Sequence, residues 1–522
     1  MKNYLKTILL SGAFLVLNSC SSSDDGSVTP QTQKAQVNIT ATVAQASESG
    51  TNGEFTLKLS RNLATETTIL LKVSGSATNG VDYKTIPSTI AIAAKTNTIV
   101  LPVEILADQL VEPDETVEVT ISVAQNSEVV LGAAVTASIT VKDGIKVVVL
   151  TPGTAKSYMT DKNATDETVA LFYNLKNIAK TSFIVGQMDA MTARYLQADA
   201  SASGDTDMKK TVGYDPGMNG ADFMFITDDQ NDGTSSSWYY NQEKIILEGV
   251  KKAYDRGMIN TFSWHLREPF EGKFFNTNQM TATAKKDAFK SILVGGVNHA
   301  YYKKKLDKVA DVFNNLRGSD GKLIPVIFRP WHEFDGDWFW WGAAYSTPAE
   351  FKQNFIFTVT YLRDVKGVKN LLYAFSPDIN FQNESDYLLR YPGDAYVDVL
   401  GYDNYGDFDN KGAAGVANAS KRMQVISNLA KARVKIAALT ETGYIIKPSA
   451  PRPFITNFFT NNLYKALTEN NVEISYMAFW NNGKDSYSTP TSGSPYENDF
   501  IQFTKKDKVL LLNKMPNMYK IQ

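Results

Sequence analysis

The feature that most constrains the fold is a regular alternation of short apolar runs and helical segments after residue 147. Eight runs begin with nearly continuous apolar residues and end in polar or aromatic ones, at 183–189, 221–228, 259–265, 324–333, 371–378, 397–405, 435–443 and 473–481. Such runs are typical of strands buried on both faces, as in parallel sheets. Eight strand–helix units predict a (β/α)8 TIM barrel with insertions over residues 147–522.

The clearest helix between these runs is expected over residues 301–318. Leu306, Val309, Phe313 and Leu316 fall on one face of it, and Gly318 is placed to cap its C-terminus. A doubly wound open sheet is the alternative arrangement. No glycine-rich phosphate loop follows any of the eight runs, so the barrel is favoured.

Residues 36–145 have a different texture and contain no tryptophan, histidine or methionine. Runs that alternate apolar and polar residues occur at 37–43, 54–60, 68–74, 98–105, 116–123 and 135–142. Alternation with a period of two indicates strands with one buried face. This region therefore predicts an all-β antiparallel sandwich of about seven strands.

The first twenty residues are expected to be a targeting segment. Lys2 and Lys6 flank an apolar run, 8–17, that is too short to span a bilayer. The run ends in Leu-Asn-Ser-Cys, which resembles a bacterial lipobox and implies that Cys20 is acylated. Residues 21–35 are expected to be a flexible tether, and their SSSDDGS start resembles the export tag of surface lipoproteins. These features predict a lipid anchor in the bacterial outer membrane, with the protein exposed at the cell surface.

Composition excludes several classes of function. The net charge is −2, with 53 basic and 55 acidic residues, so nothing favours nucleic acid or an anionic membrane surface as a partner. Cys20 is the single cysteine, which excludes a disulfide framework and a thiolate metal site. We expect a monomer, with the membrane contacted through the lipid anchor.

Two glutamates stand at the ends of predicted strands, Glu333 at the end of the fourth and Glu441 at the end of the seventh. Catalytic residues of a barrel lie at the C-terminal ends of its strands. A glutamate at one strand end is more often a salt-bridged or solvated residue, but two facing carboxylates suit a retaining glycosidase. Their separation is then about 5–5.5 Å, with one group attacking the sugar and the other donating a proton.

The stretch 328–342, FRPWHEFDGDWFWWG, holds four of the seven tryptophans beside Glu333. Sugar rings stack on aromatic faces, and their hydroxyls need directed hydrogen-bond partners, which explains this composition. Residues of an extended segment point in alternate directions, so Trp331 or Trp340 is expected to pack against the barrel. The predicted substrate-binding residues are Trp264, His265, Arg329, His332, Trp338, Trp341, Asp403, Tyr405 and Trp480.

These motifs resemble glycoside hydrolase family 26, whose members are mostly endo-β-1,4-mannanases. The resemblance rests on WHE followed by GDWFWWG, on SWH upstream and on LTETG downstream, and it covers roughly residues 150–520. It implies that Glu333 is the acid/base, that Glu441 is the nucleophile, and that catalysis needs no cofactor. It also implies a subsite −1 role for His332 and a hydrogen bond from Tyr405 to the nucleophile. The sequence departs from the family in LREPF after SWH and in NNG after Trp480.

The resemblance implies a retaining endo-acting hydrolase of β-1,4-mannosidic bonds in mannan, glucomannan or galactomannan. Two alternatives stay open. The same mechanism suits β-1,3-xylan or mixed-linkage β-glucan, and a glycan-binding surface lipoprotein without catalysis is a different class of protein. Such a decayed protein is expected to have lost a carboxylate, whereas both are present here.

Within the predicted sandwich, GVDY (80–83), ADQLVEPDE (107–115) and VKDG (141–144) resemble the Calx-beta family. That family holds structural calcium with carboxylates from several loops, as a hard cation requires. The matching positions are Glu48, Asp82, Asp108, Glu112 and Asp143. Ala107 and Gly144 interrupt the paired aspartates of the richest family sites, so solvated turn acids are the alternative.

Overall fold

The computed structural model describes residues 33–107, 113–124, 128–143 and 150–521. The described residues form two compact units, 33–143 and 150–521. Each unit has its own hydrophobic core. No helix within the described ranges is long and apolar enough to cross a membrane.

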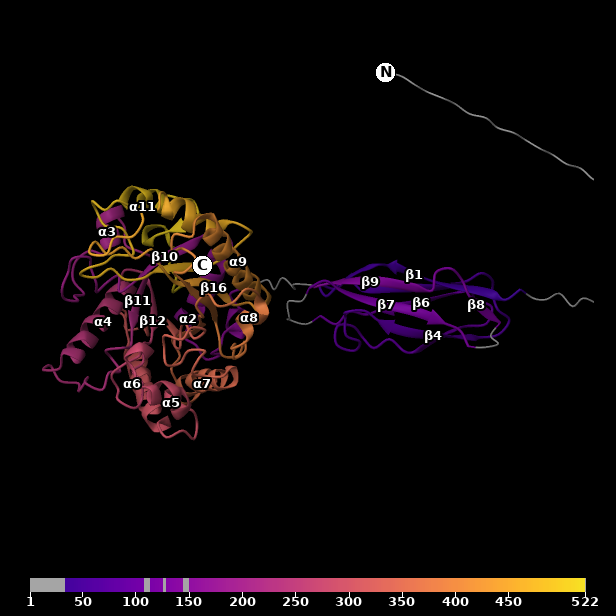
Figure 1. Cartoon of the computed structure of the whole chain (residues 1–522), viewed down its shortest axis with the longest axis horizontal. Coiled ribbons are helices and arrows are strands. Elements are labelled where there is room, and N and C mark those ends of the chain that lie inside the picture. Colours follow the sequence, from indigo (N-terminus) through magenta and orange to yellow (C-terminus); the bar gives the residue numbers. More distant parts are fainter. Residues whose placement is uncertain (1–32, 108–112, 125–127, 144–149, 522) are drawn as a thin grey trace, which may run out of the picture. The chain divides into compact units, whose positions relative to one another are not determined.

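The larger unit is a closed barrel of eight parallel strands (Figure 1). In chain order they are β10 (Phe183–Met188), β11 (Met218–Asp222), β12 (Ile259–Ser263), β13 (Val326–Arg329), β14 (Leu371–Phe375), β15 (Val399–Asn404), β16 (Ile436–Thr442) and β17 (Tyr476–Phe479). Each strand pairs with the next, and β10 closes the barrel by pairing with both β11 and β17. A short strand, β18 (Val509–Leu510), pairs with the start of β10. The predicted TIM barrel is confirmed.

The helices of this unit are α1 (Ala155–Tyr158), α2 (Asp166–Ile178), α3 (Asp207–Val212), α4 (Trp238–Asp255), α5 (Ala282–Ile292), α6 (His299–Asn315), α7 (Pro348–Thr360), α8 (Glu384–Leu388), α9 (Gly412–Ala432), α10 (Tyr464–Thr468) and α11 (Glu497–Thr504). Two 3-10 turns, η1 (Thr277–Gln279) and η4 (Leu512–Lys514), and two π-helical turns, η2 (Tyr361–Val365) and η3 (Phe458–Leu463), complete it. Local sequence signals fix where helices begin. At the start of α7, Thr347 and Glu350 form a capping box, and Pro348 occupies the first turn.

The strands of the barrel are buried along nearly their whole length, which explains why they read as continuous apolar runs. Every residue of β10, β12, β14, β15 and β16 is buried. Side chains that point outward pack under the helices, and those that point inward fill the barrel. Polar residues therefore appear mainly where the strands end, and that edge carries the site described below.

Two details of the predicted elements are wrong. The second strand ends at Asp222, not at 228, because the Asp222 carboxylate accepts the backbone N–H of Met224 at 2.7 Å and turns the chain. The helix expected to end at Gly318 ends at Asn315, where Leu316 is extended and buried. Gly318 instead belongs to a turn in which its N–H donates to the Lys322 carbonyl.

The smaller unit is a sandwich of two sheets. Its strands are β1 (Ala35–Val43), β2 (Gln45–Ser47), β3 (Gly53–Leu59), β4 (Thr67–Ser74), β5 (Thr89–Ile92), β6 (Thr98–Val103), β7 (Glu115–Ser122), β8 (Val129–Leu131) and β9 (Thr136–Lys142). The sheet orders are β6-β3-β1-β8 and β2-β9-β7-β4-β5. Alternate residues such as Phe55, Leu57 and Leu59 form the core, which confirms the predicted sandwich. The pairings are antiparallel except β1–β8 and β2–β9, which involve short strands that the sequence did not predict.

Candidate active site

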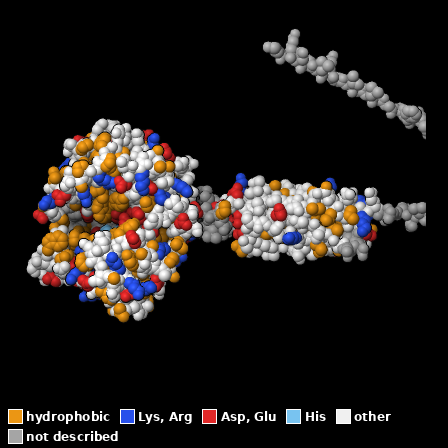
Figure 2. Space-filling model, in the orientation of Figure 1, with side chains coloured by type: hydrophobic (Ala, Val, Ile, Leu, Met, Phe, Trp, Pro, Cys, Tyr) orange, Lys and Arg blue, Asp and Glu red, His pale blue; other side chains and the backbone are white. Residues whose placement is uncertain are grey.

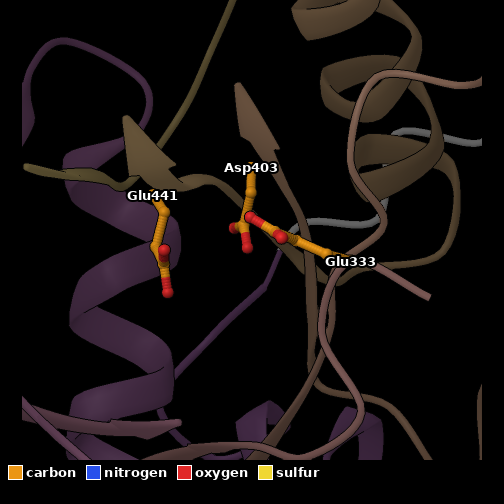
Figure 3. A group of neighbouring side chains, drawn as sticks. All are labelled: Glu333, Asp403 and Glu441. Atoms are coloured by element: carbon orange, nitrogen blue, oxygen red, sulfur yellow. The ribbon is translucent and has the colours of Figure 1, made fainter. Parts of the chain in front are cut away.

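Three carboxylates meet at the C-terminal edge of the barrel strands. Asp403 and Glu441 belong to the neighbouring strands β15 and β16, and Glu333 follows β13. One oxygen from each lies within 4.8 Å of the other two, and Figure 3 shows the Glu333 side chain reaching toward Asp403 beside Glu441. In the described part of the chain, no other three His, Cys, Asp or Glu residues approach so closely. Figure 2 shows a hollow in the surface of the barrel unit, lined by hydrophobic and acidic side chains.

The buried cation Arg329 connects two of these carboxylates. Its Nη1 donates to Asp403 Oδ2 at 2.7 Å and to Ser376 Oγ at 3.1 Å, and its Nη2 donates to Glu441 Oε1. Burial alone would lower the pKa of Arg329, but the two carboxylates outweigh burial and raise it. Arg329 therefore stays charged and holds Glu441 in place as a carboxylate.

Glu441 has a second donor in Tyr405. The Tyr405 hydroxyl donates to Glu441 Oε2 at 3.1 Å, so each oxygen of this carboxylate accepts a hydrogen bond. Burial, together with the charges of Glu441 and Glu333, raises the pKa of Tyr405 well above its usual range. The phenol thus remains a donor, which is the contact that the family resemblance implied.

Glu333 sits in a different environment from Glu441. Its backbone is left-handed, with φ of 51°, and its N–H donates to the Ser376 carbonyl. Among the residues that the structure describes, one side chain donates to its carboxylate, Trp338 through Nε1 at 2.6 Å. Burial, and then the charges of Asp403, Glu441 and Asp378, raise the pKa of Glu333 well above its usual range. A left-handed backbone is a strained conformation for a residue other than glycine, and the structure around Glu333 must hold it in place.

The third predicted strand end carries His265, which lies against His332. Their Nε2 atoms are 3.2 Å apart, and His265 Nδ1 lies 2.6 Å from Asp222 Oδ2. His332 is buried, and burial and the Arg329 charge hold its pKa well below the usual range. His332 is therefore neutral at pH 7, and it directly precedes Glu333 in the chain.

Two predicted sugar-contacting tryptophans are wrong, because their side chains belong to the core. Trp264 is 1 % exposed, and its Nε1 donates to Thr227 Oγ1 at 2.9 Å. Trp341 is fully buried, and its Nε1 donates to the His332 carbonyl at 2.7 Å, so it supports His332 rather than a ligand. Trp331 and Trp340 are also buried, as expected.

Trp338 and Trp480 are the remaining predicted aromatic residues, and both are half-buried. Trp338 contacts Glu333 directly, as described above. The centroid of the Trp480 ring lies 6.3 Å from that of His265, and the Trp480 backbone N–H donates to the Thr442 carbonyl next to Glu441. The predicted residues Glu333, Glu441, Arg329, His332, His265, Asp403, Tyr405, Trp338 and Trp480 therefore lie in one connected region.

Three acidic residues near this region were not predicted. Asp222 contacts His265, and Asp189, which directly follows β10, accepts a hydrogen bond from Asn481 at 2.8 Å. Burial raises the pKa of Asp189 to about 6 and that of Asp378, which follows β14, to about 7. Asp189 and Asp378 end the predicted runs 183–189 and 371–378, and this position is the signal that would have found them; Asp222 lay inside its predicted run.

The described residues do not by themselves form the calcium site that the Calx-beta resemblance implies. Asp108 and Glu112 lie outside the described residues, as does Cys20. Glu48, Asp82 and Asp143 are described but are not among the carboxylates close enough to share a cation. The Asp82 carboxylate instead accepts the Thr78 N–H at 2.5 Å. Calcium binding stays a prediction.

The fold is a closed parallel barrel, and its strand ends bring together one buried carboxylate held by a cation and another carboxyl group with a raised pKa. This combination is typical of barrel glycoside hydrolases. The model of glycosyl hydrolase family 26 matches residues 160–486, and the chain belongs to this family. The Calx-beta domain model matches residues 31–144.

Several relatives support this classification. GH26C from Muricauda sp. MAR_2010_75, a solved structure, is 52 % identical with a TM-score of 0.70, covering 72 % of this chain and 99 % of that one. The GH26 β-mannanase BoMan26A from Bacteroides ovatus is 30 % identical with a TM-score of 0.58, covering 68 % and 98 %. A mannan endo-1,4-beta-mannosidase from Bifidobacterium adolescentis is 38 % identical over 369 residues, which are 68 % of this chain and 36 % of the relative. The chain thus spans about a third of that curated relative's length.

Proposed function

We propose that the protein is a retaining endo-β-1,4-mannanase that hydrolyses mannan, glucomannan or galactomannan. The observation that carries the proposal is the approach of Glu333 and Glu441 oxygens to within 4.8 Å. Retaining glycosidases hold their two carboxyl groups about 5–5.5 Å apart, whereas inverting enzymes leave about 6.5–9.5 Å for a water molecule. The names of the relatives from Bacteroides ovatus and Bifidobacterium adolescentis support mannan as the polymer.

In the first step, Glu441 attacks the anomeric carbon and Glu333 protonates the departing oxygen. Arg329 and Tyr405 orient Glu441 through one oxygen each and keep its charge compensated before attack. Glu333 has no cationic partner among its described hydrogen bonds, and its raised pKa keeps a proton available at neutral pH. A covalent glycosyl–Glu441 ester forms, and the shortened chain leaves.

The second step reverses the role of Glu333. The negative charge of Glu441 is one cause of the raised pKa of Glu333, and this charge disappears when the ester forms. The pKa of Glu333 then falls, so its carboxylate accepts a proton from an incoming water molecule. Water releases the sugar with its original anomeric configuration and restores the Glu441 carboxylate.

The test combines a substrate panel with product stereochemistry. The wild-type chain is incubated with galactomannan, β-1,3-xylan and barley β-glucan, and reducing ends are counted. We expect release from galactomannan, the β-anomer first in proton NMR, and a loss of at least about 1,000-fold in Glu441→Ala. An α-anomer formed first, or full activity in Glu441→Ala, refutes the mechanism. Binding without release from any polymer favours a glycan-binding protein.

We also propose that Cys20 is acylated and anchors the protein to the outer membrane, with the sandwich unit as a spacer. The support is the position of the single cysteine at the end of an apolar run. Labelled palmitate is expected in the wild type and not in Cys20→Ser, which should leave the membrane fraction. Calcium binding in residues 36–145 is tested separately, because a bound ion raises the unfolding temperature of the sandwich and chelation lowers it again.

A further inference from the structure

Asp222, the last residue of β11, is saturated with hydrogen-bond donors. Its Oδ1 accepts the backbone N–H groups of Met224 at 2.7 Å and His265 at 3.2 Å. Its Oδ2 accepts from Ser263 Oγ and lies 2.6 Å from His265 Nδ1. Burial alone would raise the pKa of Asp222, but the His265 and Ser263 contacts outweigh it and lower that pKa. A carboxylate only accepts, so the hydrogen in the last contact belongs to His265 Nδ1.

The Nε2 atoms of His265 and His332 lie 3.2 Å apart, which is hydrogen-bond distance. One of these two nitrogens must therefore carry the hydrogen and donate it to the other. If His265 supplied it, neutral His332 would carry its own hydrogen on Nδ1. That nitrogen is buried and has no hydrogen-bond partner among the described residues. A buried N–H without an acceptor is rarer in proteins than an unused lone pair. His332 therefore supplies the hydrogen from Nε2.

We propose that Asp222 is a positioning residue that fixes the tautomers of both histidines, with hydrogen on Nδ1 of His265 and on Nε2 of His332. His332 directly precedes Glu333, and its carbonyl is held by Trp341 Nε1 at 2.7 Å. The chain of contacts from Asp222 thus sets the direction of one N–H beside the acid/base. The effect of this arrangement on activity depends on the proposed function, whereas the tautomers themselves do not.

The variant Asp222→Asn is expected to reverse both tautomers. The backbone donors of Met224 and His265 face Oδ1, so they retain the amide oxygen there and place the amide NH2 toward His265. His265 Nδ1 then becomes an acceptor, its Nε2 gains the hydrogen, and His332 accepts at Nε2 and is protonated at Nδ1. The substitution replaces one carboxylate oxygen by an amide NH2 group of similar size, so the packing around residue 222 is preserved.

The first measurement is long-range proton–nitrogen NMR of the full chain labelled with 15N-histidine. The chain has three histidines, and His299, whose Nδ1 lies 2.9 Å from the Ile292 carbonyl, provides an internal control. In the wild type we expect His265 protonated at Nδ1 and His332 at Nε2, and in Asp222→Asn the opposite for both. His332 protonated at Nδ1 in the wild type, or unchanged tautomers in the variant, overturns the proposal.

The second measurement is kcat/KM on galactomannan. Asp222→Asn is expected to lose about tenfold, the equivalent of one misdirected hydrogen bond. The matched control is Asp228→Asn in the loop that follows β11. Asp228 is a buried aspartate that pairs with Arg267 and touches neither of these histidines, so this variant should change activity less than twofold. Equal losses in the two variants contradict a positioning role. If the wild type cleaves no mannan, the proposed function fails while the NMR result still decides the tautomers.

Discussion

The hydrogen bond from Trp338 to Glu333 makes a quantitative prediction about the pH dependence of activity. Trp338 Nε1 donates to Glu333 Oε2 at 2.6 Å and is the one described side-chain donor to this carboxylate. A donor stabilises the ionised form, so this bond lowers the pKa of Glu333 and works against burial. Trp338→Phe removes the donor and keeps an aromatic face, so the pKa of Glu333 should rise.

The size of the shift follows from the strength of the bond. A hydrogen bond to a charged group contributes about 1.5–3 kcal/mol, and half-burial of the donor Trp338 favours the lower end. At about 1.4 kcal/mol per pKa unit, the expected rise is roughly one unit. The acid must be protonated for the first step, so the alkaline limb of kcat/KM moves up by roughly one pH unit.

A second variant must move the same limb the other way. Asp378, whose own pKa is about 7, adds negative charge that raises the pKa of Glu333. Asp378→Asn removes this charge, so the alkaline limb should move down. Both profiles are measured as initial rates on soluble galactomannan between pH 4 and pH 10. Shifts in the same direction, or an unmoved limb in Trp338→Phe, refute the assignment of that limb to Glu333.

Three further predictions address other groups. Tyr405→Phe removes a donor to Glu441 Oε2 and should lower kcat about tenfold with little change in KM, as measured by steady-state kinetics. Trp264→Phe removes a buried hydrogen bond and part of a core side chain; it should cost about 2 kcal/mol in urea unfolding while KM stays within twofold, and a large rise in KM would restore Trp264 as a sugar contact. Glu333→Gln should stabilise the barrel at pH 7 by about 1 kcal/mol. The pKa of Glu333 is higher in the folded than in the unfolded protein, so ionisation of Glu333 lowers the free energy of unfolding once pH exceeds the unfolded-state pKa. The gain in Glu333→Gln should therefore vanish below about pH 4, where Glu333 is protonated in both states.

The barrel and its two central carboxylates were predictable because both follow from strand periodicity. Strands buried on both faces read as apolar runs, and the first polar residues after them mark the functional edge. Alternation within an extended segment also bears on Trp264 and His265. These neighbours point in opposite directions, so if His265 faces the site, Trp264 must enter the core, as it does. The two were predicted together without applying this rule.

The roles of Asp222 and Trp341 could not be predicted, because they depend on local backbone geometry that the sequence pattern does not show. Asp222 lay inside the run predicted as 221–228, so the strand-end rule pointed to Asp228 instead; the true end is set by the bond from Met224 to Asp222 itself. Trp341 was predicted as a sugar contact because it is a tryptophan in the aromatic stretch 328–342. Trp341 follows a loop after β13 in which Trp331 and Glu333 both have positive φ, so simple alternation could not predict which way its side chain points.

The division of labour between the two glutamates follows from a count of charges. Three carboxylates share a space in which their oxygens lie within 4.8 Å, yet one described cation, Arg329, contacts this group. Arg329 contacts Asp403 and Glu441, and no cation among the described residues pairs with Glu333. Ionising all three would leave two uncompensated negative charges in a buried site, so the carboxyl group without a cation keeps its proton. In the proposed mechanism, the position of Arg329 at the end of β13 would therefore assign attack to Glu441 and proton donation to Glu333.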